Sequence, residues 1–281
     1  KINYESHQVN SDRSIKFYYA DLTDKNKLRI IFRENNIDFV INLAAQAGIR
    51  FSLQEPDQYI GSNVLGFYNL LEAIKEFNIK NFLYASSSSV YGEQAEVQFK
   101  ESFPSNNQIS LYAATKKTNE ILAKTYSNLF SFKTIGLRFF TVYGPYGRPD
   151  MAYFKFSKNL IDGAPIELFN YGIQKRDFTY IDDIIDGIEL IIENFNHKDL
   201  KDIYNIGSGK PIELKLLVEL LEQNFNRKFK IIPLAKQLGD VKHTYADISL
   251  MKSDFNYKAS TSFEKGIKEF SNWYKKKYNV R

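Results

Sequence analysis

A tyrosine and a lysine stand four residues apart at Tyr112 and Lys116, in the segment YAATK. On a helix this spacing places the two side chains on one face. An adjacent cation stabilises a phenolate and lowers the pKa of the phenol from about 10 toward a range in which it acts as a base near neutral pH. Tyr171 and Lys175 repeat the spacing, so the pair alone does not predict a site.

Four consecutive serines at positions 86–89 distinguish Tyr112 from Tyr171. They follow the strand-like segment 81–85 and precede the helix that Tyr112 opens. At the carboxyl end of a strand, such hydroxyls can hydrogen-bond a substrate alcohol and share its proton with Tyr112. The order of strand, serines, helix and Tyr-x-x-x-Lys is much rarer than the pair alone. It predicts proton transfer at a substrate alcohol, with a polar loop as the alternative reading of the serines.

The elements that must position these groups alternate between strand and helix. The pattern predicts strands over 15–19, 38–45, 81–85 and 133–140, and helices over 24–35, 56–77 and 111–130. Such alternation is typical of βαβ units with a mainly parallel sheet, so the first half is expected to be doubly wound α/β. Ligands of these sheets bind beyond the carboxyl ends of the strands, here at Asp21, at Ala44 and Ala45, at the serines and over 139–143.

A second, smaller lobe is expected after Gly144 and Pro145, where glycine and proline punctuate short segments. Helical spacing predicts helices over 181–194, 212–225 and 262–277. Residues 204–206 predict a short strand.

Composition excludes several kinds of protein and site. The 281 residues are 43% hydrophobic and 25% charged, which is average for a globular chain, and no apolar run approaches the roughly 18 residues of a membrane span. The lack of cysteine excludes disulfides and thiolate nucleophiles and fits a reducing compartment. Three scattered histidines predict no metal site, and a net charge of +5 spread along the chain predicts no nucleic-acid partner. The 15% aromatic residues are assigned by default to the core.

Nine motifs, in order along residues 15–278, make the chain similar to the extended short-chain dehydrogenases/reductases. Within that family it resembles the nucleotide-sugar epimerases, and the sequences of its motifs are most similar to those of UDP-glucuronate 4-epimerases of the capsule-biosynthesis type. The motifs are ADL at 20–22, NLAAQAG at 42–48, SNVLGFYNLLEA at 62–73, YASSSSVYG at 84–92, YAATKK at 112–117, LRFFTVYGPYGRPDMA at 137–152, KRDFTYIDD at 175–183, YNIGSG at 204–209 and GDV at 239–241.

The resemblance implies a Rossmann-like fold, NAD as cofactor and a role for each matching residue. Tyr112 resembles the catalytic base, Lys116 its partner and nicotinamide-ribose ligand, and Ser87 the catalytic hydroxyl. The other implied cofactor contacts are Asp21 and Leu22 at adenine, Ala44, Ala45 and Gln46 along the diphosphate and ribose, Asn63 as a structural or cofactor-side contact, and Phe140 beside the nicotinamide. The other implied substrate contacts are Thr141 at the sugar, Arg50 and Arg148 at a sugar carboxylate or diphosphate, Arg176 at the nucleotide diphosphate, Phe169 at uracil and Asp240 at the nucleotide ribose. Purely structural roles stay open for Arg50 and Asn63.

The reaction implied by the resemblance is inversion of C4 of a UDP-sugar through a transient 4-keto intermediate. Tyr112, helped by Ser87, removes the O4 proton, and tightly held NAD accepts the C4 hydride and returns it to the other face. UDP-glucuronate is the favoured substrate, giving UDP-galacturonate, while UDP-glucose and UDP-N-acetylglucosamine stay open.

Other chemistries of the superfamily lack their residues in this chain. Sugar dehydratases of the superfamily have the pattern Thr-Asp-Glu at the positions held here by Ser87, Ser88 and Ser89. UDP-glucuronate decarboxylases usually carry a Glu at the position of Ser89. Oxidation of the sugar alcohol to an acid needs a cysteine, and this chain has none. A non-catalytic dinucleotide-fold binding protein is the competing hypothesis from another class. The presence of Ser87, Tyr112 and Lys116 together favours an enzyme.

The sequence departs from the family at its start, where the first strand and the Gly-rich turn that cradles the cofactor pyrophosphate are absent. We therefore expect a truncated copy of a longer parent, with weakened NAD affinity and reduced stability. The expected NAD-binding domain is 1–142 plus about 172–195, and the expected nucleotide-sugar-binding lobe, also α/β, is 143–171 plus about 196–281. We expect a cytoplasmic homodimer in which the helices 56–77 and 111–130 pair across a two-fold axis.

Overall fold

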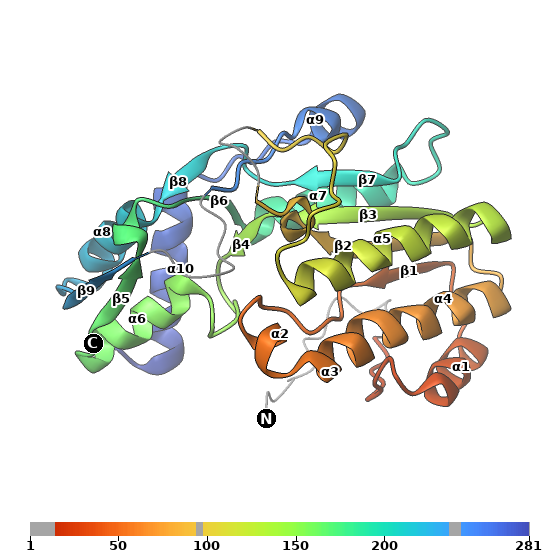
Figure 1. The fold of residues 1–281 in the computed structure, drawn as a ribbon, viewed down its shortest axis with the longest axis horizontal. Coiled ribbons are helices and arrows are strands. Elements are labelled where there is room, and N and C mark those ends of the chain that lie inside the picture. Colours follow the sequence, from red (N-terminus) through yellow and green to blue (C-terminus); the bar gives the residue numbers. More distant parts are fainter. Residues whose placement is uncertain (1–14, 94–97, 236–242, 281) are drawn as a thin grey trace.

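The computed structural model describes residues 15–93, 98–235 and 243–280. A larger part built around a parallel sheet lies beside a smaller part that contains the last helix (Figure 1). The strands are β1 (Phe39–Asn42), β2 (Asn81–Ser87), β3 (Lys133–Phe139), β4 (Thr141–Tyr143), β5 (Ile166–Phe169), β6 (Lys175–Tyr180), β7 (Ile203–Ile206), β8 (Pro211–Glu213) and β9 (Ile231–Leu234). The α-helices are α1 (Lys25–Glu34), α2 (Phe51–Gln54), α3 (Pro56–Tyr59), α4 (Gly66–Glu76), α5 (Leu111–Phe130), α6 (Ala152–Asp162), α7 (Ile181–Glu193), α8 (Leu214–Phe225), α9 (Ser249–Phe255) and α10 (Phe263–Tyr278).

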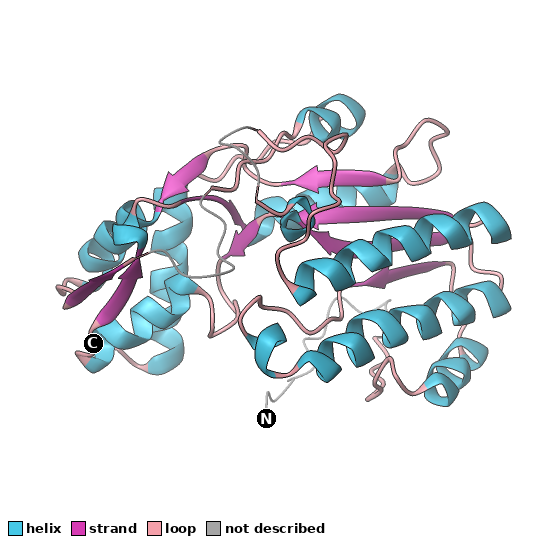
Figure 2. Ribbon diagram, viewed as in Figure 1, coloured by secondary structure: helices cyan, strands magenta, loops and turns pink. Residues whose placement is uncertain are grey.

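The larger part contains a parallel sheet in the order β1-β2-β3-β7, with helices on both faces (Figure 2). Side chains alternate across the strands, so Phe82 and Tyr84 pack with Phe67 of α4 on one face. Leu83 packs with Ile188 of α7 on the other face. Helices cover both faces, the central residues of β2 and β3 are buried, and the expected doubly wound α/β class is confirmed.

The strand predicted over 15–19 does not form, and its side chains at Ile15, Phe17 and Tyr19 are exposed. A strand exists only through pairing, and no described residue pairs with this segment or with the second edge of β1. The strand predicted over 38–45 is limited to Phe39–Asn42, where pairing with β2 occurs. The expected absence of a first strand and Gly-rich turn stays a prediction.

The helix predicted over 56–77 is interrupted by a π-helical turn at Ile60–Leu65, between α3 and α4. Its other residues follow the expected pattern, with Pro56 in the first turn and Phe67, Leu71 and Ile74 buried. The spacing of apolar residues predicts which face of a helix is buried, but it does not predict a single π-helical turn within the helix.

The smaller part pairs β5 with β9 and packs α6, α8 and α10 around them. Strands β4, β6 and β8 form a second small sheet at its border with the larger part. The core of this part is rich in aromatic rings, including Tyr143, Tyr153, Phe154 and Phe270, which contact one another edge to face or at a tilt. The assignment of the high aromatic content to the core therefore agrees with the packing.

The segment after residue 196 does not belong wholly to the smaller part, unlike the expected division. Strand β7 pairs in parallel with β3 of the large sheet, and Met251 and Phe255 of α9 pack in the core beside that sheet. The expected division assigned all of 196–281 to the lobe, whereas the pairing of β7 returns the chain to the large sheet. Among the described residues, no helix is long and apolar enough to cross a bilayer.

Candidate active site

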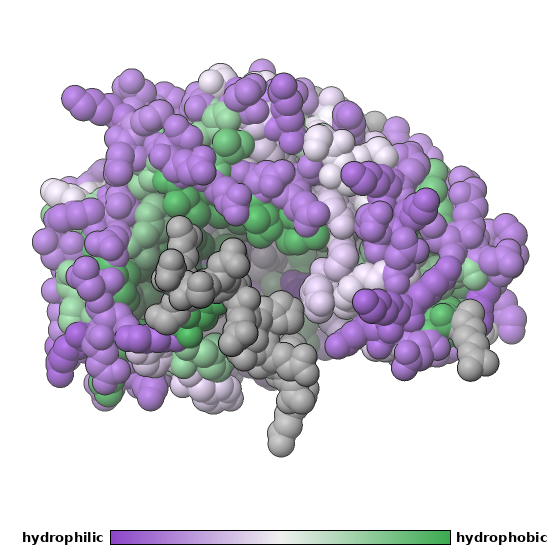
Figure 3. Space-filling model, turned by 180° about the vertical axis from the view of Figure 1, so that it is seen from behind, coloured by the Kyte–Doolittle hydropathy of each residue, from purple (hydrophilic) through white to green (hydrophobic). Residues whose placement is uncertain are grey.

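A cavity of about 1280 Å³ lies where the carboxyl ends of β2 and β3 face the smaller part. Seen from behind, hydrophobic residues surround a hollow in the surface (Figure 3). From the larger part, Ser87, Tyr112 and Phe140 line the cavity; from the smaller part, Phe169 and Arg176 do so. The location agrees with the rule that doubly wound sheets bind ligands beyond their strand ends.

Tyr112 occupies the first turn of α5, which begins because Ser110 caps it by accepting a hydrogen bond from the Ala113 amide at 3.1 Å. Burial raises the pKa of the Tyr112 phenol, while a hydrogen bond with Ser87 and the positive charge of Arg148 act to lower it. Ser87 ends β2 and is 8% exposed, so the hydroxyl is held at the strand tip beside the phenol. The structure therefore brings together the predicted hydroxyl and phenol.

Lys116 lies one turn further along α5 and is 3% exposed. Its Nζ donates a hydrogen bond to the Ala85 carbonyl oxygen at 2.7 Å, and burial lowers the pKa of the ammonium to about 8. The sequence argument gave Lys116 the task of stabilising a Tyr112 phenolate. In the structure, the positive charge of Arg148 acts to lower the pKa of Tyr112, and the Lys116 ammonium is directed to the backbone of β2.

The loop after β1 carries Ala44, Ala45 and Gln46 and is fixed by Asn63 from the π-helical turn. The Asn63 side chain accepts from the Gln46 amide at 2.8 Å and donates to the Gln46 carbonyl oxygen at 2.9 Å and to the Thr115 hydroxyl at 3.0 Å. These bonds join the loop to α5. Of the two roles left open for Asn63, the geometry supports a structural contact that places the loop.

Asp21 and Leu22 lie in the turn before α1. The Asp21 carboxylate accepts from the amide and hydroxyl of Thr23 at 2.8 and 2.7 Å, and these bonds lower the pKa of Asp21. Asn69 of α4, which sequence reasoning did not single out, donates to the Leu22 carbonyl oxygen at 3.0 Å. Of the predicted cofactor residues, Tyr112 and Phe140 line the cavity, whereas Asp21, Leu22, Ala44, Ala45, Gln46, Asn63 and Lys116 lie outside its lining.

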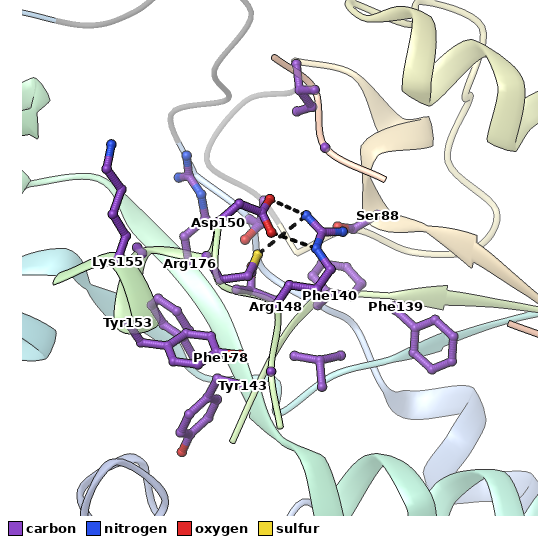
Figure 4. A pocket seen from close by; sticks show the side chains of 18 of the residues that line it. Ser88, Phe139, Phe140, Tyr143, Arg148, Asp150, Tyr153, Lys155, Arg176 and Phe178 are labelled. Atoms are coloured by element: carbon purple, nitrogen blue, oxygen red, sulfur yellow. Dashed lines mark hydrogen bonds and ion pairs between the residues drawn. The ribbon is translucent and has the colours of Figure 1, made fainter. Parts of the chain in front are cut away.

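The predicted substrate residues Arg50, Thr141, Arg148, Phe169 and Arg176 all line the cavity. Arg148 forms a bidentate ion pair with Asp150, with Nε to Oδ1 at 2.9 Å and Nη2 to Oδ2 at 2.6 Å (Figure 4). The Arg50 guanidinium carbon lies 5.2 Å from the centre of the Phe169 ring, within cation–π range. Asp240 lies outside the described residues.

Two residues of the site were missed by sequence reasoning. Asp150 forms the ion pair with Arg148. In the sequence, the only indication of this pair is that the two residues are two positions apart. Tyr59 is fully buried; its hydroxyl donates to the carbonyl oxygens of Gly48 and Ala47 at 2.7 and 3.0 Å, and its ring meets Tyr112 edge to face at 6.2 Å. No local pattern in the sequence announced that contact.

The donor set fits a dinucleotide. Ala44 and Ala45 carry only methyl side chains, which leave the backbone after β1 open to a bulky ligand, and the buried ammonium of Lys116 can donate to ribose hydroxyls. Residues 2–207 match the model of the NAD dependent epimerase/dehydratase family. The chain belongs to this family. The expected NAD-dependent epimerase with a Rossmann-like fold is thereby confirmed, and the cofactor is NAD.

Individual members of the family are similar over most of their length. A UDP-glucuronate 4-epimerase of Thermodesulfobacterium geofontis is 41% identical over 95% of this chain and 82% of its own length. Protein CapI of Staphylococcus aureus is 40% identical over 93% of this chain and 83% of its own. The crystal structure of UDP-glucuronic acid 4-epimerase from Bacillus cereus with UDP-glucuronic acid and NAD is 32% identical, with a TM-score of 0.85, over 92% of this chain and 81% of that chain.

Proposed function

We propose that this family member inverts C4 of a UDP-sugar, with UDP-glucuronate as its substrate and UDP-galacturonate as its product. The observation that carries the proposal is the pairing of Ser87 with Tyr112 at a cavity that Arg50, Arg148 and Arg176 also line. A hydroxyl and a phenol suffice to move one proton, and arginines suit carboxylate and diphosphate groups.

Tyr112 as phenolate accepts the proton of the sugar O4, and the Ser87 hydroxyl hydrogen-bonds the same oxygen. Arg148 stabilises the phenolate before the transfer, because its positive charge opposes the effect of burial on the pKa of Tyr112. Bound NAD would supply a reversible hydride acceptor for C4 of the sugar. Tyr112 then gives the proton back to the same O4, now attached to a C4 of inverted configuration, so the protein ends in the state in which it began.

Lys116, with Asp21, Leu22, Ala44, Ala45, Gln46 and Phe140, would hold the cofactor. Phe169 would stack on uracil, Thr141 would contact the sugar, Arg176 would bind the diphosphate, and Asp240 would bind the nucleotide ribose. The volume of the cavity, about 1280 Å³, leaves room for the sugar to turn between the two hydride transfers.

The Ser87, Ser88 and Ser89 cluster carries hydroxyls only, which supports transfer of a hydride out and back rather than elimination of water. The relatives named UDP-glucuronate 4-epimerase support the choice of sugar. The residues 143–171 and part of the chain after 196 would form the sugar-binding wall. The chain would work in the cytoplasm, in keeping with its lack of cysteine.

The proposed homodimer would use the helices on the outside of the larger part. Ile60, Leu65 and Tyr68 of the π-helical turn and α4, and Ile121 and Leu129 of α5, are exposed apolar side chains. Exposed apolar residues that gather on two neighbouring helices favour burial against a second copy. Sedimentation velocity should give a dimer that Ile121→Asp converts to a monomer.

Proton NMR of reactions with UDP-glucuronate, UDP-glucose and UDP-N-acetylglucosamine tests the proposal. We expect the C4 epimer of UDP-glucuronate to form, with the other two sugars converted more slowly. Faster conversion of UDP-glucose or UDP-N-acetylglucosamine would make that sugar the assigned substrate in place of UDP-glucuronate. Binding without inversion of any of the three would support a non-catalytic nucleotide-sugar binding protein instead.

A further inference from the structure

A buried polar cluster joins α5 to the carboxyl ends of β2 and β3, one helical turn beyond Lys116. Its centre is the ion pair of Glu120 and Arg138, which are 6% and 3% exposed. Arg138 donates from Nε to Oε1 at 2.8 Å and from Nη2 to Oε2 at 2.9 Å, the bidentate geometry of a strong charge-assisted pair.

Ser86 and Lys117 complete the shell around the Glu120 carboxylate. The Ser86 hydroxyl donates to Oε1 at 2.6 Å, and Lys117 Nζ donates to Oε2 at 3.2 Å. Ser86 and Arg138 are direct neighbours in the pairing of β2 with β3, so the carboxylate lies over the ends of both strands. Burial alone would raise the pKa of Glu120, but the bonds from Arg138 and Ser86 hold it below its ordinary value, so the group stays charged.

The cluster lies on the catalytic face of α5. Tyr112, Lys116 and Glu120 are spaced by four residues each and therefore share one side of the helix. Lys116 bonds the carbonyl oxygen of Ala85, and Glu120 accepts from Ser86, the next residue along β2. Hydrogen bonds to two consecutive residues of β2, Ala85 and Ser86, thus fix the position of α5 along this strand. The next residue of the strand, Ser87, is the one that contacts Tyr112.

We propose that Glu120, held by Arg138, is a positioning residue that sets the separation of Ser87 and Tyr112 through its bond to Ser86. This inference rests on the proposed function for its kinetic effect. A buried ion pair is weak evidence for stability, because apolar replacements of the whole pair are often tolerated. Positioning, in contrast, is demanding, since a displacement of about 1 Å can reduce a rate by about 10²-fold.

Two double variants that differ in one hydrogen bond test the proposal. Glu120→Gln with Arg138→Met is uncharged and keeps an oxygen that accepts from Ser86. Glu120→Met with Arg138→Met is equally uncharged and has no acceptor. We expect kcat of the second to be about 10- to 100-fold below that of the first, with KM for UDP-glucuronate equal within about twofold. Equal kcat values for the two would overturn the proposal.

Ser86→Ala removes the same hydrogen bond with the ion pair intact, and it decides the question if the variant with two methionines does not fold. It should lower kcat and leave the unfolding temperature close to that of the wild type. Lys124→Ala is the matched control: Lys124 lies on the same helix and forms an exposed ion pair with Asp202, so its loss should change neither kcat nor KM. Wild-type kcat in Ser86→Ala would contradict the proposal.

Amide hydrogen exchange separates this inference from the proposed function. Amides at the end of β2 and in the first two turns of α5 should exchange faster in Ser86→Ala and in the variant with two methionines than in the glutamine variant. If the wild type inverts no UDP-sugar, the proposed function fails and exchange alone decides the positioning role. Unchanged exchange in both variants would then refute it.

Discussion

The two walls of the cavity hold their polar side chains in different ways. On the wall of the larger part, Ser87 is 8% exposed and sits at a strand end, and behind that wall Lys116 is 3% exposed and sits on a helix. On the opposite wall, the side chains of Arg148 and Asp150 are 46% and 61% exposed and sit in an irregular loop. The groups assigned to proton transfer are held by regular elements, whereas Arg148, which is assigned to recognition, is more exposed and lies in a loop.

This difference follows the physical demands of the two tasks. Proton transfer needs donor and acceptor within hydrogen-bonding distance, so the phenol and hydroxyl must be placed before the substrate arrives. Recognition of a flexible anion tolerates a side chain that turns toward its ligand. Arg148 crosses the division, because it belongs to the opposite wall yet acts to lower the pKa of Tyr112.

The largest effect should come from the fixed wall. Tyr112→Phe removes the proton acceptor and should reduce kcat by about 10²- to 10⁴-fold, with the unfolding temperature unchanged because the ring remains. Tyr171→Phe is the matched control, since Tyr171 shares the Tyr-x-x-x-Lys spacing but is exposed. NMR of product formation measures both variants, and near-normal turnover by Tyr112→Phe would remove Tyr112 from its role.

The buried lysine should show that the fixed wall costs stability. Burial lowers the pKa of Lys116 from 10.5 to about 8, so at pH 7 the folded protein holds a charge that would be more stable in the unfolded chain. The unfolded state binds more protons between about pH 8 and 10.5, and stability therefore rises with pH across that window. Lys116→Met should lose activity but gain up to about 3 kcal/mol at pH 7.

Urea unfolding of Lys116→Met and the wild type at pH 7 and pH 10 measures this gain. The difference between the two proteins should shrink at the higher pH, because the wild-type lysine is then largely neutral. A variant less stable than the wild type at both pH values would show that packing of the lysine stem outweighs the cost of its charge.

Arg148→Gln should affect both substrate recognition and proton transfer. Loss of the guanidinium should raise KM by about tenfold and move the acid limb of the kcat profile to higher pH, because the cation that lowers the pKa of Tyr112 is gone. Besides Tyr112, the titratable groups that interact with this arginine include Asp150, Tyr59 and Tyr153. Asp150→Asn keeps the Arg148 guanidinium and should leave the acid limb of the kcat profile in place or move it to lower pH. Equal pH profiles of kcat for the two variants would contradict the role of Arg148 in lowering the pKa of Tyr112.

The smallest effect should come from a pair outside both walls. Arg29 of α1 and Glu76 of α4 form an exposed ion pair with Nη2 to Oε1 at 2.6 Å. Exposed pairs contribute less than about 1 kcal/mol, so Arg29→Ala should change the free energy of unfolding by less than that and leave kcat and KM unaltered. A clear kinetic effect would mean that α1 communicates with the cavity.

The parts of the fold that local patterns determine could be predicted from the sequence. The helix of Tyr112 and Lys116 is amphipathic, capped by Ser110 and preceded by an apolar strand, so its position followed from neighbouring residues alone. Partners far apart in the sequence were not predictable in this way. The bond of Asn69 to Leu22, the return of β7 to β3 and the failure of 15–19 to form a strand all depend on which distant segment is available for pairing.

The same limit applies to the site. The serines and the Tyr-x-x-x-Lys spacing indicated which groups could move a proton, because residue type determines chemistry. The direction of the Lys116 ammonium toward Ala85, and the influence of Arg148 on Tyr112, depend on geometry between separate elements. Spacing within one helix could not reveal either.

The wide turn at Ile60–Leu65 lies in a helical segment that anchors two separate loops. Tyr59 just before the turn and Asn63 within it bond the segment 46–48, and Asn69 after the turn bonds Leu22. Deleting one residue from the turn would restore ordinary hydrogen bonding but rotate one half against the other by about 100°. Either the loop behind the phenol or the loop before α1 would then lose its anchor, so this irregularity is a requirement of the binding edge.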